Sequence, residues 1–126
     1  MRHEDLTIFI VDDDESIPIS VKRLLKSAGC IKIATYASAE DFLRDAVLQS
    51  PCLLILDLLL PEMSGIALHR HLRKVGLAID TVLISALERE LDKARTECSE
   101  AIAYLQKPFE KGNLVAAVRL VSEANH

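Results

Sequence analysis

The chain has 126 residues, the length of one ordinary domain, and half of them are hydrophobic, so a sizeable core can form. The net charge of −4 argues against direct nucleic-acid binding, because phosphate backbones attract a surplus of lysine and arginine. The longest apolar stretch, 52–60, is interrupted by Asp57, which excludes a membrane span. We therefore expect a single globular domain over residues 1–126.

Short apolar runs alternate with amphipathic segments along the chain. The first run, 6–11, predicts a strand, and the helix after it starts near Ser16 and stops at Gly29. A second strand at 31–35 precedes a helix that begins at Ser38, whose side chain can cap it. The side chains expected on the buried faces of these two helices are Ile17, Val21, Leu24, Leu25, Ala28, Phe42, Leu43, Ala46 and Val47.

The second half of the chain repeats this alternation. The run 52–56 is apolar at every position, as in a parallel strand covered by helices on both faces. A helix follows Gly65, and further strands are predicted at 81–84 and 101–105, each followed by a helix. The side chains expected to be buried in these three helices are Ile66, Leu68, Leu72, Val75, Leu91, Ala94, Cys98, Leu114, Ala117, Val118 and Val121.

Five strand–helix units in alternation predict an α/β fold with right-handed crossovers. A complete barrel needs about twice this length. We therefore predict one open, doubly wound, five-stranded parallel sheet with the flavodoxin-like order 2-1-3-4-5. Such sheets bind ligands at the carboxyl ends of their strands, near the switch point between strands 1 and 3.

Five polar residues fall at that edge of the predicted sheet. Asp12 and Asp13 follow the first strand, Asp57 the third, Ser85 the fourth and Lys107 the fifth. Carboxylates this close repel one another, so we expect at least one raised pKa. A divalent cation relieves this repulsion, and Mg²⁺ prefers oxygen ligands. Taken alone, the acidic run could instead be a solvated turn that caps the next helix, and Asp14 and Glu15 are assigned that role.

Asp57 is the more informative of these acids. It interrupts an apolar run, where an unpaired carboxylate costs roughly several kcal/mol. The alternative is a structural carboxylate that caps a turn. A carboxylate beside a metal can act as a nucleophile and form an aspartyl-phosphate. Lys107 would then neutralise one phosphoryl oxygen, and Ser85 would donate a hydrogen bond to another.

These residues resemble the receiver domains of two-component response regulators, over nearly the whole chain. The resemblance rests on Asp12-Asp13, on Asp57 followed by Pro61, Met63 and Gly65, on Ser85-Ala86, and on Tyr104 with Lys107-Pro108-Phe109. The stretches SAGC, SAEDFL and PEMSGIAL further resemble receivers that precede a LuxR-type helix-turn-helix. No such motif follows here, so the chain is interpreted as a stand-alone receiver or a domain cut from a longer regulator.

The resemblance implies a phosphorylation-activated switch in the cytoplasm. A histidine kinase or phosphotransfer protein would phosphorylate Asp57. Mg²⁺ would be held by Asp13, Asp57 and the backbone carbonyl of Leu59, with Asp12 acting mostly through water. The domain would catalyse only its own phosphoryl transfer and slow autodephosphorylation, and is not otherwise an enzyme. The three widely spaced cysteines fit a reduced compartment.

The resemblance also implies how the signal leaves the site. Ser85 would move toward the phosphoryl group and make room for Tyr104 to turn inward. This would change the face formed by the fourth helix, the fifth strand and the fifth helix. An output domain or partner protein would read that face, in transcription control, without a membrane and without nucleic-acid contact by this domain. The sequence leaves dimerisation on phosphorylation open, and makes Lys107-Pro108 a candidate cis bond.

Four residues depart from the family pattern. Glu100 stands where glycine is frequent, so it would be strained if that turn needs a positive φ. Asp80 replaces a frequent proline. Leu59 and Leu87 are apolar where polar residues are frequent. We expect these two leucines to hinder the hydrolytic water and to prolong the phosphorylated state; alternatively they only cover the neighbouring loop.

Three other classes of protein share parts of the pattern. A haloacid-dehalogenase-type phosphatase usually has a second aspartate two residues after the nucleophile, where this chain has Leu59. A pseudo-receiver, which binds without phosphorylation, would not need the complete set of acids, serine and lysine. A flavodoxin relative needs a phosphate-cradling loop after the first strand, where residues 12–15 are acidic.

Overall fold

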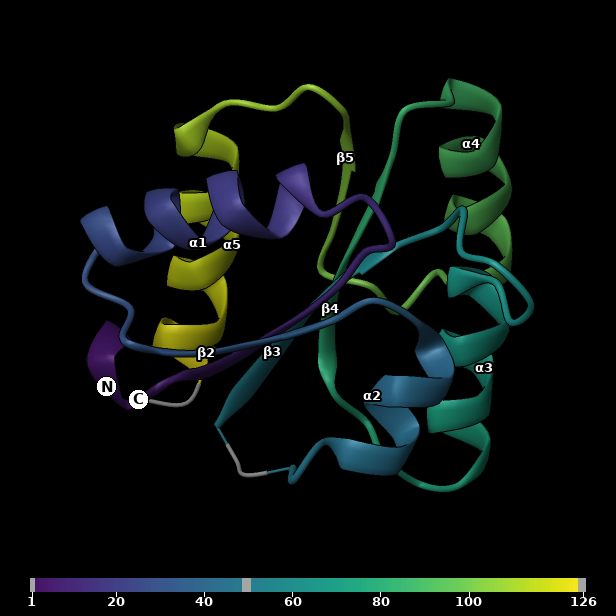
Figure 1. The fold of residues 1–126 in the computed structure, drawn as a ribbon, viewed down its shortest axis with the longest axis horizontal. Helices are drawn as coiled ribbons and strands as arrows, with labels where there is room; N and C mark the ends of the chain where they lie inside the picture. The colour runs from purple at the N-terminus through teal and green to yellow at the C-terminus, as the bar shows by residue number, and fades with distance from the viewer. Residues whose placement is uncertain (1, 49–50, 125–126) are drawn as a thin grey trace.

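The computed structural model describes residues 2–48 and 51–124 as one parallel sheet with helices on both faces (Figure 1). The strand order is β2-β1-β3-β4-β5, as predicted. The strands are β1 (Thr7–Val11), β2 (Lys32–Tyr36), β3 (Cys52–Asp57), β4 (Asp80–Ser85) and β5 (Ala103–Gln106). The helices are a 3-10 turn η1 (His3–Asp5), α1 (Ser16–Ser27), α2 (Ala39–Asp45), α3 (Gly65–Lys74), α4 (Glu88–Glu97) and α5 (Lys111–Ala124).

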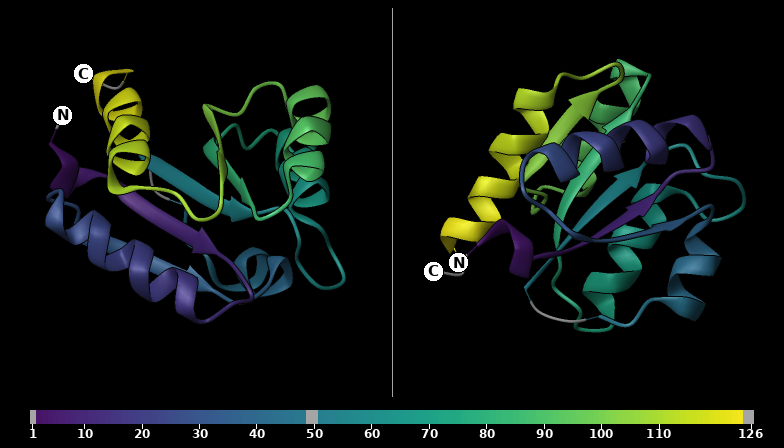
Figure 2. Two further views of the ribbon diagram at one scale, coloured as in Figure 1. Left: turned by 90° about the horizontal axis from the view of Figure 1, so that it is seen from above. Right: turned by 60° about the vertical axis from the view of Figure 1, so that its left-hand side comes forward.

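Two hydrophobic clusters lie on opposite faces of this sheet, because successive strand side chains point to opposite sides. Ile8 and Ile10 of β1 pack with α1 and α5 on one face, whereas Phe9 and Val11 pack with α2, α3 and α4 on the other. Figure 2 shows the same layers from two further directions. The prediction that the third strand is buried on both faces is confirmed.

The helix faces agree with the sequence except near helix ends. Leu43 is 38% exposed, Val47 is 71% exposed and Val75 is 53% exposed, so their predicted burial is wrong. Val47 lies beyond the end of α2, and Val75 is the C-cap of α3, where the 3.6-residue period no longer fixes the side chain's direction. Ala28, also a C-cap, is half-buried.

Local hydrogen bonds explain where helices begin. Ser38 Oγ accepts from the Asp41 amide at 3.0 Å, as predicted. At the start of α1, Asp14 Oδ1 accepts from the Ser16 amide at 3.0 Å and from its hydroxyl at 2.7 Å, which fits the role expected of Asp14 at this helix end. Gly29, with φ of 97°, follows the end of α1 as predicted. No helix of the described residues is long and apolar enough for a bilayer.

Candidate functional site

The carboxyl ends of β1 and β3 bring three carboxylates together. Asp57 ends β3, and Asp12 and Asp13 directly follow β1, its hydrogen-bonded neighbour. One oxygen from each of the three carboxylates lies within 4.8 Å of the others. Asp12 is only 2% exposed and Asp57 only 4% exposed, whereas Asp13 is exposed. The acids that the sequence placed at this edge therefore meet there.

Lys107 completes the cluster from the end of β5. Its Nζ lies 2.8 Å from Asp12 Oδ2 and 3.3 Å from Asp57 Oδ2. The Lys107 amide donates to the Ser85 carbonyl at 2.8 Å, which places the two loops side by side. The Lys107-Pro108 bond, a candidate for the cis isomer from the sequence, is cis. The direct pair between Lys107 and Asp12 was missed by the sequence, because no spacing rule pairs residues 95 positions apart.

Burial and neighbouring charges shift the pKa values of both Asp57 and Lys107. Burial raises the pKa of Asp57 to about 6, and the neighbouring charge of Asp12 adds to the shift. The amide of Leu59 and the ammonium of Lys107 oppose this rise. The predicted raised pKa is confirmed, but removal from water contributes more than repulsion. Burial alone would lower the pKa of Lys107, yet its hydrogen bond to Asp12 and both carboxylate charges raise it overall.

Gly65 fixes the backbone that carries Asp57. A Cβ at position 65 would lie 2.3 Å from the Asp57 carbonyl oxygen and 2.7 Å from Leu58 Cα. The Gly65 amide donates to the Leu58 carbonyl at 3.0 Å, and the Leu58 amide donates to Ile84 at 2.9 Å. The backbone at the start of α3 therefore packs in direct contact with the backbone at the end of β3. In the sequence Gly65 stood out as part of a motif and as the start of a helix. The structure shows why glycine is needed there: no side chain fits against the backbone of Asp57 and Leu58.

Ser85 and Leu59 lie beside the cluster. Ser85 is fully buried, and its Oγ accepts from the Leu87 amide at 3.1 Å. The Leu59 amide donates to Asp57 Oδ1 at 3.1 Å, so this loop wraps around the carboxylate. A metal-ligand role for the Leu59 carbonyl stays a prediction. The side chains of Leu59 and Leu87 are 44% and 36% exposed.

Tyr104 lies apart from the carboxylates. Its hydroxyl donates to the carbonyl of Cys98, directly after α4, and the Arg95 guanidinium carbon lies 5.6 Å from its ring centroid. Helix α4 runs opposite to the strands, so Cys98 lies at the other end of the sheet from Asp57. The turn before β5 also differs from the strained geometry considered above: among described non-glycine residues, Glu62 has a positive φ, and Glu100 does not.

The donor set fits a hard divalent cation. Three carboxylates supply only oxygen atoms, the ligands that Mg²⁺ prefers, and no histidine or cysteine belongs to the group. Two of the carboxylates are nearly buried and one faces solvent, so the cluster has an open side. The arrangement would suit an ion that keeps waters and accepts a phosphoryl oxygen.

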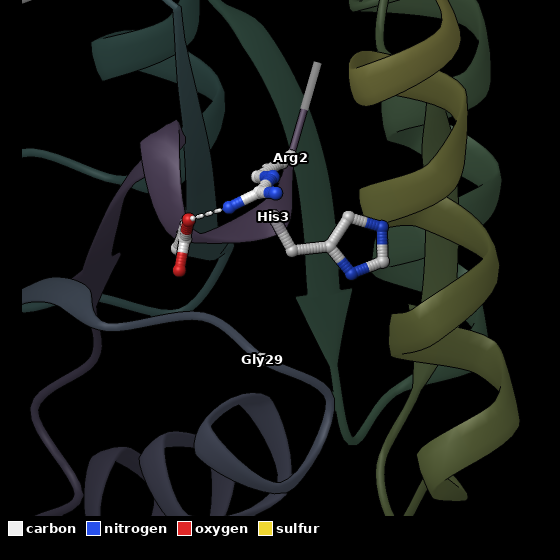
Figure 3. Close-up of a pocket in the computed structure, with 4 residues that line it drawn as sticks. Arg2, His3 and Gly29 are labelled. Atoms are coloured by element: carbon white, nitrogen blue, oxygen red, sulfur yellow. Dashed lines mark hydrogen bonds and ion pairs between the residues drawn. The ribbon is translucent and has the colours of Figure 1, made fainter.

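A second hollow lies away from this edge, beside the amino terminus (Figure 3). Arg2, His3, Glu4 and Gly29 line it. Arg2 Nη1 donates to Glu4 at 2.9 Å, and His3 Nδ1, which must donate to a carbonyl, lies 3.0 Å from the Ala28 oxygen. The His3–Ala28 contact joins η1 to the C-cap of α1, and we assign this hollow a structural role.

Comparison with known proteins agrees with the geometry. The family model for the response regulator receiver domain matches residues 8–119. The response regulator protein TmoT of Ectopseudomonas mendocina is 32% identical over 94% of this chain and 54% of its own length. The alkaline phosphatase synthesis transcriptional regulatory protein PhoP of Bacillus subtilis is 31% identical over 90% of this chain and 47% of its own.

The fold comparison gives the same family. The crystal structure of FixJ-N matches with a TM-score of 0.81 and 30% identity, covering 94% of each chain. The chain spans about half the length of the curated relatives it matches. Sequence, sheet order and the carboxylate edge thus agree, and this chain belongs to the response regulator receiver domains, which relay signals in a phosphorylation-dependent manner.

Proposed function

We propose that Asp57 is the phosphoryl acceptor of this receiver. The observation that supports this most directly is the nearly buried Asp57 carboxylate, 3.3 Å from the Lys107 ammonium and clustered with Asp12 and Asp13. The donor would be a phosphohistidine on a histidine kinase or phosphotransfer protein. An Asp57 oxygen attacks phosphorus, the P–N bond breaks, and the imidazole leaves with a proton.

The residues around Asp57 then stabilise the negative charge of the phosphoryl group. Lys107 shifts its hydrogen bonds toward a phosphoryl oxygen, and the Ser85 hydroxyl leaves the Leu87 amide to donate to another. Mg²⁺, held by Asp13, Asp57 and the Leu59 carbonyl with Asp12 acting through water, would neutralise further charge on that group. The domain catalyses this transfer to itself and its slow reversal, and we propose no other substrate.

The signal would leave through a change in packing. Movement of Ser85 opens space for Tyr104, which gives up its bond to Cys98 and turns inward. The face of α4, β5 and α5 changes as a result. An output domain or partner protein would read this face in transcription control, in the cytoplasm; an adjoining LuxR-type helix-turn-helix stays a prediction, as does dimerisation.

Mass spectrometry after incubation with acetyl phosphate and Mg²⁺ tests the acceptor. We expect one phosphoryl adduct on the wild-type chain and none on Asp57→Asn, because an amide is not a nucleophile toward phosphorus at neutral pH. Asp80→Asn, at the opposite end of a strand, is the control and should keep the adduct. An adduct that survives in Asp57→Asn would exclude this acceptor. Sustained turnover of a small phosphate ester would favour a phosphatase instead.

Mg²⁺ should stabilise the folded chain. A ligand that binds only the folded state adds RT ln(1 + [Mg]/Kd), about 1.4 kcal/mol at ten times Kd. Thermal or urea unfolding with and without Mg²⁺ measures this increment. Asp13→Ala should abolish it, and Glu15→Ala, also acidic and exposed, should retain it. An unchanged increment in Asp13→Ala would place the ion elsewhere.

Leu59 should slow loss of the phosphoryl group. Its side chain is exposed beside Asp57, where it would hinder an attacking water. We expect Leu59→Asn to dephosphorylate several-fold faster, measured as decay of the adduct after the donor is removed. Val75→Asn, which replaces an exposed apolar side chain far from the site, is the control. Equal decay in wild type and Leu59→Asn would show that Leu59 only covers its loop.

A further inference from the structure

A buried histidine links α3 to the turn before β5. His69, on α3, is only 2% exposed, and its Nε2 lies 3.1 Å from Glu100 Oε1. A carboxylate oxygen can only accept, so Nε2 carries the hydrogen. This bond is the main cause that holds the pKa of Glu100 below its usual value. The contact, here called the His69–Glu100 link, has no role in the chemistry at Asp57.

The same turn also holds Tyr104. The Ala101 amide donates to the Cys98 carbonyl at 3.2 Å and closes the turn. That carbonyl also accepts the Tyr104 hydroxyl. Glu100 lies between Cys98 and Ala101 in the chain. The His69–Glu100 link therefore fixes the segment that carries the Cys98 carbonyl, the acceptor for Tyr104. The turn is thus joined to α3 on one side and to the aromatic ring of β5 on the other.

We propose that His69 and Glu100 are positioning residues that hold Tyr104 in its orientation toward Cys98, and so favour the unphosphorylated arrangement. This inference rests on the function proposed above for Ser85 and Tyr104. A contact shifts a two-state equilibrium only when its strength differs between the states. The His69–Glu100 link holds the Cys98 carbonyl where the Tyr104 hydroxyl reaches it, so it strengthens a hydrogen bond that exists only while Tyr104 points toward Cys98.

A neighbouring contact provides a matched comparison. Glu97 joins α3 to α4, since Arg70 Nη1 of α3 lies 3.7 Å from Glu97 Oε1 of α4. Glu97 precedes Cys98 but lies outside the turn between Cys98 and Ala101. Loss of Glu97 therefore weakens the α3–α4 contact without removing the His69–Glu100 link.

The test follows Tyr104 directly. The chain has two tyrosines and no tryptophan, so in a Tyr36→Phe background ring-labelled tyrosine reports on Tyr104 alone by NMR. In Glu100→Ala, the Tyr104 signal of the unphosphorylated protein should shift toward its phosphorylated position. Phosphorylation by acetyl phosphate and Mg²⁺ should be about fivefold faster, the lower end of typical coupling between sites.

Further variants separate positioning from simple support. Glu100→Gln keeps an acceptor for His69 and should restore most of the wild-type signal and rate. His69→Leu should act like Glu100→Ala, and the double variant should add nothing further. Glu97→Ala should leave the Tyr104 signal unchanged. A lower melting temperature in Glu100→Ala with an unchanged Tyr104 signal and rate would overturn the inference.

Failure of the proposed function gives a different pattern. A wild-type chain that takes no phosphoryl group, or an adduct that persists in Asp57→Asn, removes both proposals. Normal phosphorylation at Asp57 with no effect of Glu100→Ala removes only the positioning role of His69 and Glu100.

Discussion

Replacing Gly65 with alanine is expected to destabilise the domain by about 3 kcal/mol, the upper end of the usual cost of overpacking. The added Cβ would lie 2.3 Å from the Asp57 carbonyl oxygen, and this neighbour is backbone rather than a flexible side chain. The chain can relieve the contact only by moving the start of α3 away from the end of β3. Urea unfolding measures the loss, and phosphorylation by acetyl phosphate should also slow, because Asp57 would be displaced.

Gly112 provides the control for this substitution. It lies in the first turn of α5, and a Cβ at that position would meet nothing within 4 Å beyond its own helix. Alanine there should raise the free energy of unfolding by about 0.5 kcal/mol, the usual gain for an unstrained helical site. The two glycines should therefore give changes of opposite sign. A neutral Gly65→Ala would show that α3 is free to shift.

Replacing Asp57 with asparagine is expected to stabilise the metal-free domain, by about 2 kcal/mol at pH 8. Burial raises the pKa of Asp57 to about 6, so folding disfavours its ionised form. Asparagine has nearly the same shape and can keep the hydrogen bond from the Leu59 amide. The residue that we propose to carry the chemistry thus weakens the fold when no cation is bound.

The pH dependence follows from the sign of this shift. Below about pH 4 the carboxyl is protonated in both folded and unfolded chains, so the two proteins should differ little. The advantage of Asp57→Asn should grow as the pH rises toward 6 and then level off. Urea unfolding in a chelator at several pH values measures it. Asp13→Asn, at an exposed position, should give a much smaller gain, and Mg²⁺ should reduce the advantage of Asp57→Asn.

The five strand–helix units and the carboxylate edge could be predicted because apolar periodicity marks each strand and the polar residues fall where the strands end. An uninterrupted apolar run with one acid, Asp57, is a strong signal, since few environments tolerate it. Helix ends were predicted less well, as Val47 and Val75 show, because apolar spacing continues past the point where capping ends the helix.

Contacts between distant residues could not be predicted from one sequence. Lys107 with Asp12, and His69 with Glu100, are polar pairs formed by the three-dimensional arrangement of loops and helices. The only signal for the second pair was Glu100 itself, a charged residue where glycine is frequent. Its side chain reaches the buried imidazole in a turn that needs no positive φ.

The end of α5 lies beside η1, at the edge of the sheet away from Asp57 (Figures 1 and 2). Any module fused behind α5 would thus start at the edge of the sheet opposite Asp57. The open side of the carboxylate cluster would stay accessible to a kinase. Phosphorylation at Asp57 and the attachment point of such a module would then lie at opposite ends of the domain. The signal between them would then pass through the changed packing of α4, β5 and α5 proposed above, and not through direct contact between the phosphoryl group and the module.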